Sequence, residues 1–260
     1  MAELDYQARG HVATITLNRP HRRNAFTLAM LDAWAEALRT AESDRTVRVV
    51  ILTGAGDSFC AGVDLDEFKS VSRTPLEERD LLTQRVHQVA HAMDALSKPA
   101  IAAVNGVAVG AGMDMALMCD LRLASESARF SEGYIRVGLV PGDGGCYYLP
   151  RLIGREQALR MLWTGDFVDA SEALSLGLVS EVHPDARIQA AATALADKIA
   201  ARAPLAVQVI KRAVNSAFST DARTALDTIA SHQAVVLSTR DSAEAFAAFK
   251  EGRDPHFEGR

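Results

Sequence analysis

Two hydrophobic periods alternate along the first two thirds of the chain. In residues 11–17, Ala13, Ile15 and Leu17 alternate with threonines, the period of a half-buried strand. Thr27 precedes a run whose apolar residues recur every three or four positions, which predicts a capped helix. The same patterns predict further strands over 47–52, 101–109 (broken at 105–106), 121–124 and 128–130, and a helix over 81–96. Alternating strands and helices favour an α/β architecture with parallel strand pairing.

The last third of the chain carries a different pattern. From about residue 185 onward no run has the character of a strand. Helical periods cover 188–201, 205–218, 222–237 and 243–250, and Pro204 suits the first turn of a helix. We therefore expect a mixed α/β core over residues 1–200 and an all-helical region over 201–260.

Composition and charge narrow the class of protein. The 260 residues are 48% hydrophobic and 23% charged, as in ordinary globular proteins, and the net charge of −5 leaves no electrostatic footprint for nucleic acid. No run is long and apolar enough for a membrane span, and the first ten residues are too polar for a signal peptide. The three cysteines and seven histidines lack metal-ligand spacing. We expect a cytoplasmic protein with reduced cysteines in its core and no metal.

One segment, Val104–Asp120, combines a strand, a turn of small residues and a helix start. The turn is Gly110-Ala111-Gly112, and small residues let a ligand approach the backbone closely. The first N–H groups of a helix are unpaired and, with the helix dipole, favour negative charge. Asp114 lies in the first helical turn. The segment therefore predicts an oxyanion site beside a carboxylate, the alternative being a tight strand-to-helix junction with no ligand.

Several short motifs occur in order along the chain. They are LNRP (17–20), NA (24–25), FCAGVDL (59–65), VNGVAVGAGMDMALMCD (104–120), PGDGG (141–145) and LPRLIG (149–154). In this combination the chain resembles the enoyl-CoA hydratase/isomerase (crotonase) superfamily over nearly its whole length. The resemblance implies a spiral of ββα units followed by a helical trimerisation region. It also implies an acyl-CoA substrate, with coenzyme A entering as part of that substrate and no separate cofactor, and a homotrimer or dimer of trimers.

The resemblance also implies where the thioester binds. Its carbonyl oxygen would be held by two backbone N–H groups, those of Val63 and Ala111, in a hole that stabilises an enolate. The residues implied to bind the rest of the substrate are Arg23, Ala25, Ala61, Asp64, Leu65, Gly110, Pro141 and Gly142. Arg23 would contact coenzyme A phosphates, the alternative being a solvated side chain.

The acid–base residues depart from the pattern of hydratases in this superfamily, which use two glutamates. Asp114 stands at the first position and Tyr134 at the second, and both are candidate catalytic residues. An ordinary tyrosine can donate a hydrogen bond but is a poor base at neutral pH. Asp143 lies on the PGDGG loop, one residue after the position at which related isomerases carry a catalytic group. We expect Asp114 and Asp143 to shuttle a proton. Glu132 is interpreted as a surface or loop residue, with a role as base the alternative.

These residues favour double-bond isomerisation over hydration of an acyl-CoA. Hydrolysis or carbon–carbon cleavage in the same site is a second possibility. A third is an acyl-CoA-binding protein without chemistry. Either carboxylate can be the acid or the base at this point.

Overall fold

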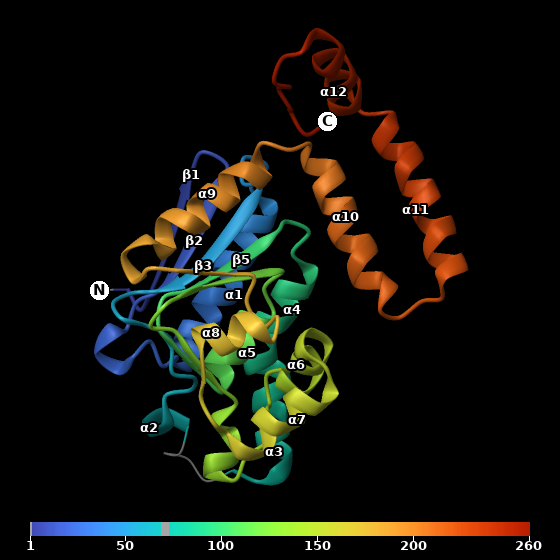
Figure 1. The fold of residues 1–260 in the computed structure, drawn as a ribbon. Coiled ribbons are helices and arrows are strands. Elements are labelled where there is room, and N and C mark those ends of the chain that lie inside the picture. Colours follow the sequence, from blue (N-terminus) through green and yellow to red (C-terminus); the bar gives the residue numbers. More distant parts are fainter. Residues whose placement is uncertain (1, 69–72) are drawn as a thin grey trace.

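Two β-sheets form the core of the molecule in residues 2–68 and 73–260, the part of the chain that this computed structural model describes (Figure 1). The larger sheet has the order β1-β2-β3-β5-β7-β10 and the smaller one the order β4-β6-β8-β9. Neighbouring strands are parallel except for the pairs β1–β2 and β8–β9. The strands are β1 (Leu4–Arg9), β2 (Val12–Leu17), β3 (Val49–Gly54), β4 (Ser58–Cys60), β5 (Ala100–Val104), β6 (Val107–Val109), β7 (Leu121–Ser125), β8 (Arg129–Ser131), β9 (Val168–Asp169) and β10 (Glu181–His183).

After β1 and β2, which both belong to the larger sheet, the pairs β3–β4, β5–β6 and β7–β8 each contribute one strand to each sheet, and helical segments follow. β3 continues into β4, and β5 into β6, so the chain leaves the larger sheet for the smaller one each time. Asn105 stabilises the second of these crossings, because its side-chain amide donates to the carbonyl oxygens of Gly54 and Gly56. This repeated ββα path confirms the predicted α/β architecture.

Helices cover the sheets on both faces. They are α1 (Leu28–Ser43), α2 (Leu65–Phe68), α3 (Pro75–Leu81), α4 (His87–Ala95), α5 (Ala111–Leu117), α6 (Gly145–Ile153), α7 (Arg155–Thr164), α8 (Ala170–Ser175), α9 (Ile188–Ala200), α10 (Pro204–Ala217), α11 (Ala222–Leu237) and α12 (Arg240–Glu251), with short helical turns η1 (Pro20–Arg22), η2 (Leu82–Val86), η3 (Gly133–Val137) and η4 (Asp185–Arg187). Within the described residues, no helix has the length and apolar character needed to cross a membrane.

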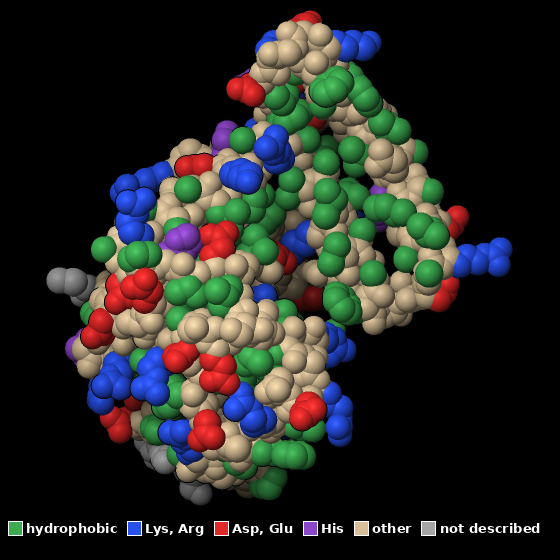
Figure 2. Space-filling view, viewed as in Figure 1, with side chains coloured by type: hydrophobic (Ala, Val, Ile, Leu, Met, Phe, Trp, Pro, Cys, Tyr) green, Lys and Arg blue, Asp and Glu red, His purple; other side chains and the backbone are tan. Residues whose placement is uncertain are grey.

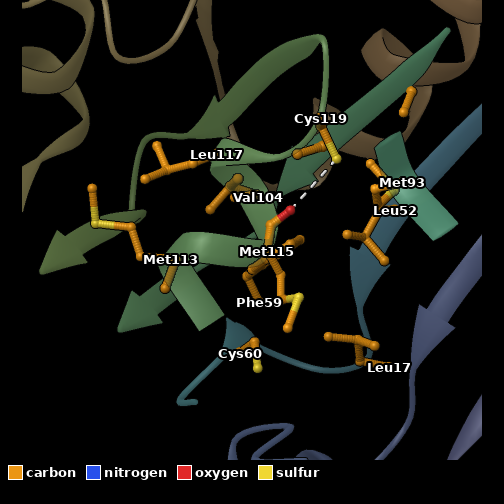
Figure 3. Packing of buried hydrophobic residues seen from close by; sticks show 14 of the residues in the cluster. Leu17, Leu52, Phe59, Cys60, Met93, Val104, Met113, Met115, Leu117 and Cys119 are labelled. Atoms are coloured by element: carbon orange, nitrogen blue, oxygen red, sulfur yellow. Dashed lines mark hydrogen bonds between the residues drawn. The ribbon is translucent and has the colours of Figure 1, made fainter. Parts of the chain in front are cut away.

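The buried strands have apolar residues on both faces, which explains their continuous hydrophobic runs. In β3, Val49 and Ile51 pack in the smaller core cluster with α9, while Val50 and Leu52 belong to the larger cluster on the other face. Figure 3 shows part of this larger cluster, in which side chains of α5 lie against those of the strands. The core therefore holds the start of α5 in a defined position.

The C-terminal helices lie differently from the rest. α10, α11 and α12 extend away from the two-sheet body (Figure 1), and α10 and α11 have no buried residue. Figure 2 shows apolar side chains along these helices. Within this chain, Lys211 of α10 connects α10 to the body, because its ammonium group pairs with Asp120 at 2.8 Å and donates to the carbonyl of Lys98. The division into two domains at residue 200 stays a prediction.

Some expectations about local structure are wrong. β1 was not predicted, because this edge strand pairs on one side only and its residues are half-buried or exposed. The helix expected over 81–96 begins earlier, at Pro75, where Thr74 and Glu77 form a capping box, and it contains a π-helical turn at 82–86. Cys60 and Cys119 are buried as expected, but Cys146 is exposed.

Candidate active site

The site is built around the start of α5, where β6 ends and Gly110 turns the chain. Gly110 has a φ of 52°, a left-handed conformation that favours glycine, and its N–H donates to the carbonyl of Ser131. The first intrahelical bond runs from the N–H of Asp114 to the carbonyl of Gly110. The N–H groups of the intervening residues, Ala111 among them, therefore have no partner within the helix.

A second backbone segment approaches this helix start. Gly62 has a φ of 92°, and a methyl group added there would lie 3.6 Å from the Ala111 nitrogen. The neighbours of Val63 pair with Phe26: Phe26 donates to the Gly62 carbonyl, and Asp64 donates to the Phe26 carbonyl. The N–H of Val63 lies between these two bonds and so points away from Phe26. The two predicted oxyanion donors thus come from segments that lie side by side.

Three carboxyl groups and one phenol gather beside this helix start. Asp114, Glu132 and Asp143 are all buried, with exposed fractions of 0%, 0% and 5%. The ring of Tyr134 packs over Gly110, and its hydroxyl oxygen lies 2.8 Å from Oδ2 of Asp114 and 2.8 Å from Oδ2 of Asp143. We call Asp114, Glu132, Tyr134 and Asp143 the acid cluster. It brings together the three residues predicted to be catalytic and adds Glu132.

The proton count of the acid cluster follows from this geometry. A phenol has one proton, so Tyr134 can donate to only one of its two carboxyl partners. A contact of 2.8 Å to the other partner needs a proton as well, which a protonated carboxyl group would supply. Asp114 and Asp143 therefore share one carboxyl proton and one negative charge. This is the arrangement of an acid beside a base.

Burial and mutual repulsion account for that extra proton. Burial, with the charge of Asp143 adding to it, raises the pKa of Asp114 to about 7, although the Tyr134 hydroxyl opposes the shift. Burial also raises the pKa of Asp143, and the same hydroxyl together with His87 opposes that shift. Burial raises the pKa of Tyr134 well above its ordinary value, so the phenol stays neutral. A carboxyl group with a pKa near 7 can take and give a proton at neutral pH.

The loop that carries Asp143 is anchored from α4. His87 of α4 lies with Nε2 2.7 Å from the carbonyl oxygen of Gly142 and can donate a hydrogen bond to it. A methyl group added to Gly142 would lie 3.5 Å from the side chain of Leu82. These contacts place Asp143 opposite Tyr134, and neither contact was predicted from the sequence.

Family comparisons agree with this geometry. The model of the enoyl-CoA hydratase/isomerase family matches residues 7–260. The chain belongs to this family. Among its relatives, it is 38% identical over 245 residues to a short-chain-enoyl-CoA hydratase of Clostridium acetobutylicum, covering 94% of this chain and 93% of that protein. It is 36% identical over 250 residues to 1,2-epoxyphenylacetyl-CoA isomerase of Escherichia coli, covering 96% of this chain and 95% of that protein.

Solved structures show the same fold in the family. The enoyl-CoA hydratase of Bacillus anthracis superimposes with a TM-score of 0.95 at 35% identity, and the match covers 100% of both chains. The protein is therefore an enzyme of the hydratase/isomerase type with the crotonase fold. Whether such an enzyme hydrates or isomerises its substrate depends on its acid and base groups, which here are those of the acid cluster.

The remaining predicted residues of this enzyme lie on the loop after β2, around the start of α2 and on the loop before α6. Leu65 is partly exposed on α2, and Pro141 and Gly142 are half-buried beside Asp143. Ala61 donates its N–H to the carbonyl of Arg23, whose side chain is exposed, and Ala25 accepts a hydrogen bond from Arg19.

Asp64 has a structural partner. Its carboxylate lies 2.9 Å from the guanidinium of Arg19, and both side chains are largely buried. This hydrogen bond is the main cause that lowers the pKa of Asp64. Asp64 thereby links the segment before α2 to the loop after β2, and its predicted contact with substrate stays a prediction.

The structure shows contacts or burial of two residues, Asn24 and Glu132, that the sequence did not reveal. Asn24 adopts a left-handed conformation, with a φ of 56°, and its buried side chain donates to the carbonyls of Ala55 and Ser58. Asparagine is one of the few residues that tolerate this conformation. Glu132 was interpreted as a surface or loop residue; it does lie in the loop between β8 and η3, but it is fully buried and not at the surface. Its position two residues before Tyr134 was the available signal.

Proposed function

We propose that this enzyme moves a carbon–carbon double bond within an acyl-CoA thioester by proton transfer, with coenzyme A bound as part of the substrate. The observation that carries this proposal is the Tyr134 hydroxyl, which bridges Asp114 and Asp143. The two bridged carboxyl groups supply an acid and a base together. The phenol takes the place of the second carboxylate that hydratases resembling this chain use.

The reaction follows from the proton count. The ionised carboxylate removes a proton from the α-carbon of a 3-enoyl-CoA, so that a C–H bond breaks and an O–H bond forms. The neutral carboxyl group then gives its proton to the γ-carbon, which yields the 2-enoyl-CoA. The two carboxyl groups have now exchanged their protonation states. The Tyr134 hydroxyl then gives its proton to the newly ionised carboxylate and takes the proton of the newly protonated carboxyl group, which restores the starting arrangement.

The backbone donors stabilise the intermediate of this reaction. Removing the α-proton leaves a dienolate whose negative charge lies on the thioester oxygen. The N–H groups of Val63 and Ala111 would hold that oxygen, and such a donor typically lowers the barrier by roughly 2.7–4 kcal/mol. Alanine at position 111 keeps the donor, because only the backbone takes part.

Hydration of a 2-enoyl-CoA is the second candidate. It is favoured by Oδ1 of Asp143, which is buried without a hydrogen-bond partner. This oxygen could orient a water molecule. The hydratase of Clostridium acetobutylicum and the isomerase of Escherichia coli are both similar to this chain, so family membership is compatible with either reaction.

The C-terminal helices support a proposal about assembly. α10, α11 and α12 expose large apolar side chains, and monomeric proteins rarely leave so many uncovered. They are Ile210, Val214, Phe218, Leu226, Val235, Leu237, Phe246 and Phe249, the last 87% exposed. We propose that other copies of this chain cover them in a homotrimer or a dimer of trimers, and that the enzyme works in the cytoplasm.

The role of Asp143 in the reaction can be tested by substitution. Asp143→Asn removes one of the two exchanging carboxyl groups, and general acid–base catalysis is typically worth about 10²–10⁴-fold. We expect turnover of a 3-enoyl-CoA, followed by absorbance of the conjugated product, to fall at least about 100-fold. Asp166→Asn, an exposed position outside the acid cluster, is the matched control. Wild-type turnover in Asp143→Asn would rule out its proposed role.

A further inference from the structure

Glu132 is the member of the acid cluster that the proposed reaction does not use. It lies between β8 and η3, is fully buried, and neither of its carboxyl oxygens has a hydrogen-bond partner in the required geometry. A buried carboxyl group without a partner is costly, and few occur in folded proteins. Its presence in the centre of the site therefore calls for an explanation other than packing.

Glu132 and Asp114 converge on one point beside Gly145. A methyl group added to Gly145 would lie 2.5 Å from Oδ1 of Asp114 and 2.9 Å from each carboxyl oxygen of Glu132. Tyr134 bonds the other oxygen of Asp114, Oδ2, so Oδ1 is the atom that faces Glu132. The absence of a side chain at position 145 lets the two carboxyl groups approach each other.

The groups that act on Glu132 come from every element around it. Asp114 on α5 and Asp143 on the loop before α6 act on Glu132 directly, and Glu132 in turn acts on Cys146 of α6. Tyr134 on η3 acts on both aspartates, and His87 on α4 acts on Asp143. Burial raises the pKa of Glu132 to about 10, and the negative charges of Asp114 and Asp143 raise it in the same direction. Glu132 is thus a neutral carboxylic acid at neutral pH.

We propose that Glu132 is a positioning residue that donates its carboxyl proton toward Oδ1 of Asp114 and so keeps Asp114 able to ionise during turnover. The inference rests on the proposed function, in which Asp114 must pass between its neutral and ionised forms. A donor at Oδ1 favours the ionised form and opposes the effect of burial. Without it, Asp114 would hold its proton more tightly and the exchange with Asp143 would slow.

Two substitutions separate this role from packing. Glu132→Gln keeps the shape and an N–H donor but cannot ionise. Glu132→Met keeps a similar volume and has no donor. If Glu132 only fills space, the pKa of Asp114 should be the same in wild type, Glu132→Gln and Glu132→Met. If Glu132 is a donor, that pKa should rise in Glu132→Met and stay near the wild-type value in Glu132→Gln.

Infrared spectra of the whole protein, without substrate, test the inference directly. At pH 7 the difference between wild type and Glu132→Gln should show the loss of a carboxylic acid band. The loss of a carboxylate band instead would overturn the inference. A pH titration, with the Asp114 band identified from Asp114→Asn, should show an acid dissociation constant about tenfold lower in Glu132→Met and within about twofold of wild type in Glu132→Gln. An unchanged constant in Glu132→Met would also overturn it.

These outcomes are distinguishable from failure of the proposed function. Thermal unfolding of each variant checks that it is folded, and if Glu132→Met does not fold, the band lost in Glu132→Gln still decides the protonation state. The acid side of the pH–rate profile for a 3-enoyl-CoA should move to higher pH in Glu132→Met only. If no 3-enoyl-CoA reacts in wild type while the infrared results hold, the proposed isomerisation fails and the donor role of Glu132 toward Asp114 stands.

Discussion

Replacing Tyr134 with phenylalanine removes the hydroxyl that bridges Asp114 and Asp143 and leaves the ring in place over Gly110. Both contacts are 2.8 Å long and lie in a buried site. The hydroxyl lowers the pKa of each aspartate, so its loss should raise both values. The reaction needs one ionised carboxylate, and the acid side of the pH–rate profile should therefore move to higher pH.

The magnitude follows from the strength of the lost hydrogen bond. A hydrogen bond to a charged group contributes about 1.5–3 kcal/mol, which corresponds to roughly one to two pH units. The pKa of Asp114 is about 7 in the intact site, so half of it is ionised at pH 7. A pKa of about 8–9 would leave about 1–10% ionised, and kcat/KM at pH 7 should fall about 5- to 50-fold. At pH 9 most of the loss should be recovered.

The assay is isomerisation of a 3-enoyl-CoA followed by absorbance from pH 5 to 9. Tyr147→Phe is the matched control, because it removes a tyrosine hydroxyl elsewhere. Tyr147 is exposed and lies beside Tyr148 and Arg151. Among the described residues, its hydroxyl makes no hydrogen bond to the acid cluster. An acid side that stays in place in Tyr134→Phe would refute the electrostatic reasoning. An equal loss at pH 7 and pH 9 would also refute it, and would instead assign the hydroxyl to proton relay alone.

Three further variants test the pKa of Asp114, the Asp64–Arg19 pair and the proposed assembly. The pKa of Asp114 is raised to about 7 in the folded protein, so the unfolded chain ionises first and the fold loses stability as pH rises from about 4 to about 7. Asp114→Asn should therefore raise the free energy of unfolding at pH 8, by on the order of 2 kcal/mol, and change it little at pH 4, as measured by urea unfolding. Asp64→Ala leaves the buried Arg19 with one ion-pair partner fewer and should cost about 2 kcal/mol in the same assay, and an unchanged free energy of unfolding would contradict this. Leu226→Asp with Phe249→Asp places charges on the exposed apolar helices and should give a monomer by sedimentation, whereas an unchanged oligomer would argue against assembly through them.

The sequence predicted those parts of the structure that depend on local periodicity. Strands buried on both faces, such as β3 and β5, have continuous apolar runs and were found within two residues of their true ends. The caps at Thr27 and the helix start at Pro204 were also predicted, because each depends on chemistry within one turn. The edge strand β1 was missed because it lacks such a run.

The acid cluster could be predicted only in part. The types and order of Asp114, Tyr134 and Asp143 indicated proton transfer, but their contacts depend on how η3 and the loop before α6 fold onto α5. Glu132 was placed at the surface because its one local signal, the position two residues before Tyr134, does not show whether the carboxyl group is buried. Its burial depends on Gly145 of α6, which leaves the space that both carboxyl groups occupy.

We infer that the acid cluster transfers protons within the substrate and does not add water. Incubation with a 3-enoyl-CoA and, separately, with crotonyl-CoA in deuterated buffer, followed by mass and absorbance measurements, tests it most directly. We predict conversion of the 3-enoyl-CoA to the conjugated 2-enoyl-CoA, with no gain of the mass of water. Addition of water to crotonyl-CoA with no migration of the double bond in the 3-enoyl-CoA would contradict the account.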